Sequence, residues 1–335
     1  MALLSPSWGG PSAFPKVYES GVAELRGRFH LDVREYPTTR ADPIDLLAHP
    51  EERARDLVSA LRDPGVQGIL FTIGGDDSCR LLPLLPADVW SGAPKVMMGF
   101  SDATTLLTSA NLSGWVTFHG PSVMAGISQL GSLPGESAQH LSAMLFAGGT
   151  GHEYVGFPQW SDGYPRWEHE ENVGRVNPPH RSEGPRWLRG DAAVEGPLFG
   201  GCLEVLEFLK GTRFWPPPEA WRGRVLFLET SEAAPSPVQV RWALRNYGLM
   251  GVFDEIAALL VGRAARYPEA RKRELDAVVT EVVADEFHHP ELPVVTDLDF
   301  GHTDPQWVLP LGVRCRVDPI GKSLRLTEPW LKVPA

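Results

Sequence analysis

The sequence predicts a two-domain α/β protein whose N-terminal domain holds a mostly parallel sheet. Short apolar runs alternate with segments of helical periodicity in both halves of the chain, as strands that alternate with helices do. The 335 residues exceed the usual length of one domain. Between the halves lies a stretch rich in Trp, Pro and Gly that has no sustained periodicity. We therefore expect an N-terminal α/β domain over 1–160, a linker with loops over 161–190, and a C-terminal α/β domain over 191–335.

The elements of the N-terminal domain follow from the spacing of its apolar residues. Tyr18, Val22 and Leu25 recur at helical spacing, whereas the run from Gly68 to Ile73 is apolar in the way of a strand buried on both faces. Strands that alternate with helices indicate parallel pairing. The expected elements are a helix over 12–27, a strand over 30–36, a helix over 54–61, strands over 68–73 and 95–100, and a helix that begins near 102.

The C-terminal domain shows the same alternation and ends in a predicted hairpin. Apolar and polar residues alternate from Val313 to Val317, and Leu324 and Leu326 follow across a Pro-Ile-Gly turn. Three cations at 271–273 are expected on the solvated face of a long helix. The expected elements are a helix over 203–209, a strand over 224–228, a helix from 237 to 247, a strand over 256–261, a helix over 269–287, a strand over 292–298 and the terminal hairpin.

Composition excludes several classes of function. The 42 acidic residues outnumber the 31 Lys and Arg, so the formal charge of -11 provides no field that attracts nucleic acid or an anionic membrane. No run approaches the apolar length of a membrane span, and the first residues lack the pattern of a signal peptide. The three cysteines stand more than a hundred residues apart, which argues against a disulfide framework. We expect a cytoplasmic protein with no nucleic-acid or membrane partner.

Ser101 is the first candidate for chemistry. It stands where the apolar strand Lys95 to Phe100 runs straight into a helix start, and such a junction lifts a serine above the sheet beside unpaired helix amides. A serine in this position is more often only an N-cap. A catalytic role would also require a base and an acid that orients it.

Glu229 and His302 are the candidate acid and base. Glu229 ends the apolar strand that precedes it, at the sheet edge where open α/β proteins keep their sites, although acids at strand ends are also common in plain loops. His302 lies in a loop between Gly301 and Pro305, and His119 is its rival. The pair His288-His289 has no partner at ligand spacing, so no metal is expected.

Six ordered motifs together resemble the LD-carboxypeptidase family of serine peptidases over about residues 2 to 328. The loop Gly-Gly-Asp-Asp-Ser and the run from Glu229 to Pro237 are more similar to the microcin immunity branch than to the murein-recycling branch. The motifs are Ile-Gly-Gly-Asp-Asp-Ser with Leu81-Leu82-Pro83, Val-Met-Met-Gly-Phe-Ser-Asp-Ala-Thr, Thr117-Phe-His-Gly-Pro121, Glu195-Gly-Pro-Leu-Phe-Gly-Gly201, Leu226-Phe-Leu-Glu229, and Phe300-Gly-His302 with Leu309-Pro-Leu-Gly-Val313.

The resemblance implies a catalytic triad of Ser101, Glu229 and His302. It also implies that the N-terminal domain carries the serine, that the C-terminal domain carries the acid and the base, and that the active site lies in the cleft between them. No metal or organic cofactor is implied, and members are commonly homodimers. The chain departs from the family at Cys202, because asparagine often follows the two glycines there.

Backbone amides near Ser101 are candidates for an oxyanion hole. A helix start and a glycine turn both present unpaired N–H groups, so we expect the amide of Asp102 to act with that of Gly75 or Asp76. As a plain β-turn the Gly74-Gly75 doublet would look the same.

The resemblance implies a small peptide or an aminoacyl-nucleotide as substrate. In the microcin immunity branch the bond joins a peptide or amino acid to a nucleotide-like group, and in the murein branch it is an L-to-D peptide bond. Trp187 is expected to stack on a base, and Arg181 or Arg186 to meet its phosphate, although packing alone would explain these residues. A non-catalytic two-lobe binder of small molecules is the alternative from another class.

Overall fold

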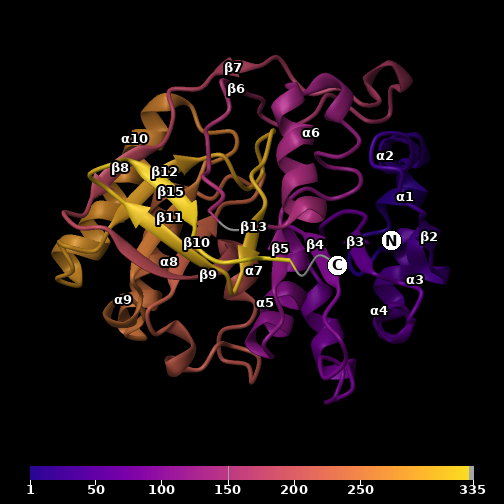
Figure 1. The fold of residues 1–335 in the computed structure, drawn as a ribbon, viewed down its shortest axis with the longest axis horizontal. Coiled ribbons are helices and arrows are strands. Elements are labelled where there is room, and N and C mark those ends of the chain that lie inside the picture. The colour runs from indigo at the N-terminus through magenta and orange to yellow at the C-terminus, as the bar shows by residue number, and fades with distance from the viewer. Residues whose placement is uncertain (150, 332–335) are drawn as a thin grey trace.

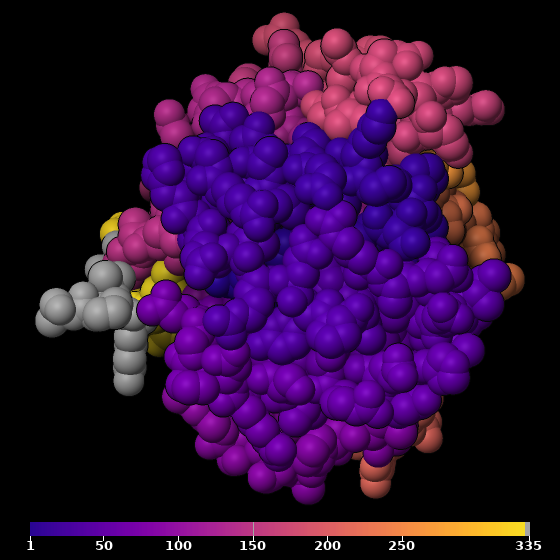
Figure 2. All heavy atoms as spheres, turned by 90° about the vertical axis from the view of Figure 1, so that its right-hand side faces the viewer, coloured from indigo at the N-terminus to yellow at the C-terminus, as the bar shows by residue number. Residues whose placement is uncertain are grey.

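A computed structural model describes residues 1–149 and 151–331 and confirms the α/β fold (Figure 1). The two halves of the chain lie side by side, and most of the face in Figure 2 belongs to the N-terminal half. The strands are β1 (Ala2–Leu4), β2 (Arg34–Glu35), β3 (Gly68–Phe71), β4 (Val96–Gly99), β5 (Thr117–His119), β6 (Gln159–Trp160), β7 (His180–Arg181), β8 (Arg186–Arg189), β9 (Val194–Cys202), β10 (Val225–Glu229), β11 (Ala258–Gly262), β12 (Val294–Leu298), β13 (Leu309–Leu311), β14 (Arg314–Asp318) and β15 (Ser323–Leu326). The helices are α1 (Gly10–Ala13), α2 (Pro15–Gly27), α3 (Pro43–Ala48), α4 (Pro50–Arg62), α5 (Thr104–Leu112), α6 (Gly135–Ser142), α7 (Leu203–Glu207), α8 (Pro237–Leu249), α9 (Val252–Glu255) and α10 (Glu269–Thr280).

The first sheet has the order β13-β5-β4-β3-β1-β2, and all its pairs are parallel except β13 with β5. Its central strand β3 is buried along its whole length, as its apolar run predicts. The strand expected over 30–36 shrinks to the two residues of β2 at the edge. The helix expected over 12–27 begins as α1 and restarts at Pro15, which is favourable in the first turn of α2.

One strand of the first sheet comes from the C-terminal end of the chain. Leu309 and Leu311 of β13 are buried where β13 pairs antiparallel with β5. Pro310 between them is tolerated because β13 is an edge strand and needs hydrogen bonds on one side only. The range 191–335 therefore contributes strands to both sheets.

The second sheet has the order β15-β14-β9-β10-β11-β12-β8. Strands β9 to β12 are parallel, and the β14–β15 hairpin pairs antiparallel with β9, as the sequence predicted for the chain end. The segment 161–190, expected as linker and loops, also contains regular structure: β7 pairs with β6, and β8 adds an antiparallel edge to β12.

Helix α10 corrects one expectation about charge. Lys272 was expected on the solvated face with its neighbours, yet it is buried. It shares the face of Leu275 and Val279, which lie three and seven residues further along. Its ammonium lies 3.2 Å from a carboxylate oxygen of Asp297 and 4.1 Å from the ring centre of Trp160.

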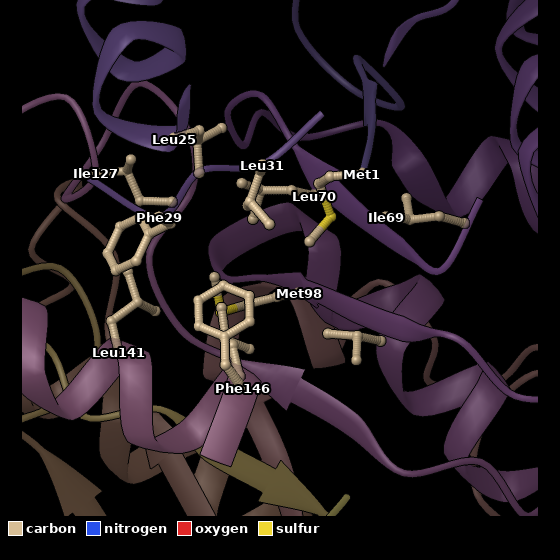
Figure 3. Close-up of a pocket in the computed structure, with 12 residues that line it drawn as sticks. Met1, Leu25, Phe29, Leu31, Ile69, Leu70, Met98, Ile127, Leu141 and Phe146 are labelled. Carbon is tan, nitrogen blue, oxygen red and sulfur yellow. The ribbon is translucent and has the colours of Figure 1, made fainter. Parts of the chain in front are cut away.

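A small apolar cavity lies within the N-terminal half (Figure 3). Met1, Leu25, Met98 and Phe146 are among its walls. Its free space of about 10 Å³ is no larger than one water, and its lining is apolar. It is a packing gap in the core and no candidate for ligand binding. Among the described residues no helix has both the length and the apolar character that crossing a membrane requires.

Candidate active site

Ser101 stands on a strained backbone directly after β4. Its φ of +57° is rare for a residue other than glycine, and such strain concentrates at functional sites. The residue turns the chain from strand to a short 3-10 turn over Ser101–Ala103, which continues as α5. Gly74 makes room for it, because a Cβ there would lie 2.9 Å from the Ser101 hydroxyl oxygen. The strand-to-helix junction thus presents the serine as the sequence predicted.

The side chain of Asp102 fixes the glycine loop against Ser101. Its buried carboxylate accepts hydrogen bonds from the backbone N–H of Ser78 at 2.8 Å, from that of Asp77 at 3.1 Å, and from the hydroxyl of Ser7. Burial raises the pKa of this carboxyl. Sequence reasoning assigned a role only to the amide of Asp102 and missed the carboxylate, although an acid next to the candidate nucleophile was a signal.

Arg53 anchors the same loop from α4. Its guanidinium is buried and holds both carboxylate oxygens of Asp77, at 2.7 and 2.8 Å. It also donates to the backbone carbonyls of Pro6 and Ser7. A two-point arginine–carboxylate pair fixes direction as well as distance. A single arginine inside a helical pattern gives no sign of such a partner in the sequence.

Glu229 and His302 are far apart in the sequence but contact each other in the second half of the chain. Glu229 ends β10 and is buried, and its Oε2 lies 2.7 Å from Nδ1 of His302. Gly301 permits this approach: its φ is +101°, and a Cβ there would lie 2.8 Å from the same oxygen. The carboxylate at the strand end and the histidine of the loop are therefore paired, which is the arrangement that orients an imidazole.

His119, the other candidate base, lies beside Glu229 in the buried interior. Its Nε2 is 4.0 Å from Oε1 of Glu229, and its ring packs edge-on against Phe227 and Phe300. Burial, and to a smaller extent the charge of His302, lowers the pKa of His119 to about 3. This histidine is uncharged and does not line the cavity described below.

The other ring nitrogen of His302 contacts a residue that sequence reasoning missed. Nε2 lies 3.0 Å from Oε2 of Glu232, in the loop that follows β10. Burial alone would lower the pKa of His302, but Glu229 and Glu232 outweigh it and raise this pKa to about 10. The hydrogen bond with His302 lowers the pKa of Glu232 to about 2. With a carboxylate at each nitrogen, the resting imidazole is charged.

A cavity of about 790 Å³ connects these groups and receives residues from both halves. Ser101 and His302 both line it, as do Gly75 and Asp76. Its walls carry aromatic side chains and several charges. The residues that carry them are Trp8, Phe14, Phe100, Tyr164, Trp167, Phe208, Asp162, Glu204, Glu232 and Arg266.

The three residues expected to bind substrate lie elsewhere. Arg186 is on β8, where its guanidinium pairs with Asp276 at 2.6 Å and Asp297 at 3.1 Å. Trp187 follows it in the same edge strand, and Arg181 is exposed on β7. None of the three lines the cavity. The aromatic residues of the inter-domain segment that do line it are Tyr164 and Trp167, and the lack of periodicity could not distinguish Trp167 from Trp187.

Three backbone amides near Ser101 are the candidates for the expected oxyanion hole, and two of them, those of Gly75 and Asp76, belong to residues that line the cavity. Within the described chain, the N–H groups of Gly75 and Asp76 donate to no protein acceptor. The N–H of Asp102 belongs to the first turn of a 3-10 segment, where amides have no partner inside the helix. The geometry is compatible with the expected oxyanion hole.

Cys202 replaces the expected asparagine at the domain boundary. Its backbone N–H donates to the hydroxyl of Thr104 on α5 at 3.0 Å, and the residue lines the cavity. This contact joins the end of β9 to the helix that follows Ser101. In the described ranges, no cluster of three or more His, Cys, Asp or Glu residues is arranged to hold a metal ion.

Comparison with known proteins identifies the family to which the chain belongs. The model of the LD-carboxypeptidase N-terminal domain matches residues 1–120, and that of the LD-carboxypeptidase C-terminal domain matches residues 195–317. The chain belongs to the LD-carboxypeptidase family. It is thus a member of a peptidase family, as the six sequence motifs indicated.

Relatives within the LD-carboxypeptidase family include immunity proteins. The microcin C7 self-immunity protein MccF of Escherichia coli is 30% identical over 84% of this chain and 79% of its own length. An MccF-like protein from Streptococcus pneumoniae, solved in complex with AMP, superposes with a TM-score of 0.87 at 26% identity, covering 98% of each chain. MccF in complex with glutamyl sulfamoyl guanosine superposes with a TM-score of 0.84 at 27% identity, covering 99% of this chain and 96% of MccF.

Proposed function

We propose that this protein is a serine peptidase that hydrolyses the amide-type bond of aminoacyl-nucleotide or peptidyl-nucleotide conjugates. The observation that carries the proposal is the geometry of one cavity: a strained serine lines it together with a histidine whose Nδ1 is held by a buried glutamate. Nucleophile, base and orienting acid are the three groups that acyl transfer by a serine requires.

In the proposed reaction, Nε2 of His302 removes the hydroxyl proton of Ser101 while the serine oxygen attacks the acyl carbon. Glu229 accepts the hydrogen bond from Nδ1 and stabilises the imidazolium that forms. The amides of Asp102 and Gly75 or Asp76 would stabilise the oxyanion. His302 then gives its proton to the leaving nitrogen, and water, activated in the same way, hydrolyses the ester on Ser101 and releases the acid.

The nucleotide half of the proposed substrate is supported by the walls of the cavity. Trp8, Phe14 and Trp167 line it, and aromatic rings offer any base a face for stacking. Arg266 supplies a cation for a phosphate or sulfamoyl oxygen. Complexes of MccF and an MccF-like protein with nucleotide-like ligands also support this substrate class. The roles expected for Trp187, Arg186 and Arg181 gain no support from their positions, so the proposal does not use them.

An assay with two substrates tests the proposal. Purified protein is incubated with an aminoacyl sulfamoyl adenosine or a murein tetrapeptide, with Ser101→Ala as control, and a serine-directed phosphonate is applied in parallel. We expect the nucleotide conjugate to be cleaved, and the phosphonate to label Ser101 alone. Cleavage of the tetrapeptide only would assign the protein to cell-wall recycling. Absence of both hydrolysis and labelling would favour a non-catalytic binding protein.

A further inference from the structure

Nε2 of His302, the nitrogen that the reaction proposed above requires, already has a partner in the structure. Its Nε2 must face Ser101 to take a proton, yet it lies 3.0 Å from Oε2 of Glu232. Within the described part of the chain, no side chain is hydrogen-bonded to the hydroxyl of Ser101. Since both ring nitrogens are paired with carboxylates, the resting ring is charged and cannot act as a base. In the proposed reaction, Glu232 would therefore have to move away from Nε2 before His302 accepts a proton.

Glu232 is free to make that change. It stands in the loop between β10 and α8, and 63% of its side-chain surface is exposed. Two other acids of the cavity are engaged by the fold: Glu204 accepts from the N–H and hydroxyl of Ser231, and Asp162 accepts from the N–H of Arg266. The backbone donor to the Glu232 carboxylate is its own N–H, so this contact is internal to the residue. Because Glu232 is largely exposed, water can solvate its carboxylate during the change, and a cation on the substrate could then become its new partner.

A positive group on the substrate would supply that partner. The lining of the cavity contains four acids, namely Asp76, Asp162, Glu204 and Glu232, against two cations, Arg266 and the charged His302. Resting on the proposed function, we propose that Glu232 is a specificity residue that binds a free α-ammonium group on the acyl residue of the substrate and thereby releases Nε2 of His302. Conjugates whose acyl residue has a free amine are then the preferred class, over conjugates whose amine is acylated.

The reach of the two groups supports the α-position. The α-nitrogen is two bonds from the carbon that Ser101 attacks, and the proton from Ser101 goes to Nε2, from which Glu232 is one hydrogen bond away. An ammonium gives Glu232 a charge-assisted hydrogen bond, whereas an acylated nitrogen offers one neutral N–H. A charge-assisted bond contributes more to binding, so the free amine should be favoured.

Protons balance in this exchange. The ammonium takes the place of the imidazolium beside Glu232, and the Nε2 proton leaves to solvent, which makes His302 a neutral base. The groups facing His302 then are Glu229 from β10, His119 from β5 and Asp304 from its own loop, with Arg266 on the side of Glu232. One proton is released for each substrate molecule bound.

The test compares Glu232→Gln with the wild type on an aminoacyl sulfamoyl adenosine and on its N-acetyl derivative. We expect wild-type kcat/KM to favour the free amine by about tenfold or more, and Glu232→Gln to treat the two conjugates within about twofold. Glu168→Gln, which removes the same charge from an exposed residue beside Trp167, should keep the wild-type preference. Calorimetry of the free-amine conjugate with Ser101→Ala in buffers of different ionisation enthalpy should show proton release.

Two results would overturn the inference. One is a preference for the free amine that survives in Glu232→Gln, and the other is an equal loss on both substrates in the folded variant, which would mean that Glu232 only positions His302. Failure of the proposed function is distinguishable from these, because wild-type protein would then hydrolyse neither conjugate.

Discussion

On the N-terminal side of the cavity Ser101 is held by backbone and by buried pairs, whereas on the C-terminal side His302 lies between two carboxylates. The loop around Ser101 is fixed by Asp102, which accepts two backbone amides and a hydroxyl, and by Arg53, which clamps Asp77. The imidazole of His302 has one buried acid on its first nitrogen and one largely exposed acid on its second. Both sides lie at the ends of parallel strands, so the same architecture holds Ser101 in a fixed geometry and leaves His302 in contact with an exposed acid.

The difference separates what is fixed from what can respond. The geometry at Ser101 does not depend on substrate charge, because its supports are internal to the fold. The state of His302 does depend on it, because the pKa of this ring is raised by Glu229 and also by Glu232, which solvent and substrate can reach. We expect substitutions on the first side to cost stability or all turnover, and those on the second to change the conditions under which turnover occurs.

Loss of the nucleophile should have the largest effect. Ser101→Ala is expected to lower kcat by about 10⁴-fold or more, and Ser101→Ala/His302→Ala to lose little further, because a nucleophile and its base act as a unit. Steady-state kinetics on the folded variants measures this. Near-normal activity in Ser101→Ala would remove the mechanism, and if His119→Ala alone abolished turnover, the base would be misassigned.

The clamp on the N-terminal side should be visible in stability. Arg53→Met leaves the Asp77 carboxylate without its buried partner and should lower the free energy of unfolding by about 3–5 kcal/mol. Arg80 is a matched control, because it contacts the same carboxylate at 3.2 Å while 43% of its side chain is exposed. Arg80→Met should cost about 0–1 kcal/mol. Chemical denaturation measures the free energy of unfolding of both variants. Equal losses would show that the buried pair of Arg53 with Asp77 contributes no more to stability than the exposed contact of Arg80.

Substitution of an aromatic residue that lines the cavity should change KM more than kcat. Trp167 lines the cavity and contacts Phe14 and Tyr164, so Trp167→Ala should raise KM by about tenfold, which is within the range for the loss of one stacked base. Trp187→Ala lies in an edge strand outside the cavity and should leave KM unchanged. The reverse result would restore Trp187 as the substrate-binding residue of the original expectation.

The smallest expected change is a shift in pH dependence on the C-terminal side. His302 must be neutral to act as a base, and its raised pKa of about 10 means that kcat/KM should climb with pH through the neutral range. Glu232→Gln removes one of the charges that raise this pKa, so the acid limb should move to lower pH. A pH profile with an uncharged acyl residue measures the shift, and an unmoved limb would mean that Glu232 does not govern the base.

Local patterns along the chain predicted much of this architecture. The central strands β3, β4 and β10 follow from apolar runs, and their ends hold the residues that the sequence singled out, since polar side chains directly after a buried strand have few other places to lie. The ordered motifs predicted the family, which the comparisons confirm.

What the sequence could not predict depends on partners far along the chain. Lys272 was expected on a solvated face and Arg186 at a substrate phosphate, yet both pair with Asp297. Trp167 faces the cavity and Trp187 does not, although both stand in the same irregular segment. Glu232 acquires its partner only when the loop of His302 returns to the end of β10. Pairings between distant segments leave no periodic trace in a single sequence.

The return of β13 to the first sheet has a consequence for how the protein is made. On the ribosome, residues up to β5 emerge early, but the edge of β5 stays open until residues 309–311 leave the exit tunnel. An open strand edge of this kind invites wrong pairing, so the nascent chain passes through a vulnerable interval. Glu229 and His302 also emerge long after Ser101. The three residues of the proposed triad can therefore come together only when synthesis is almost finished.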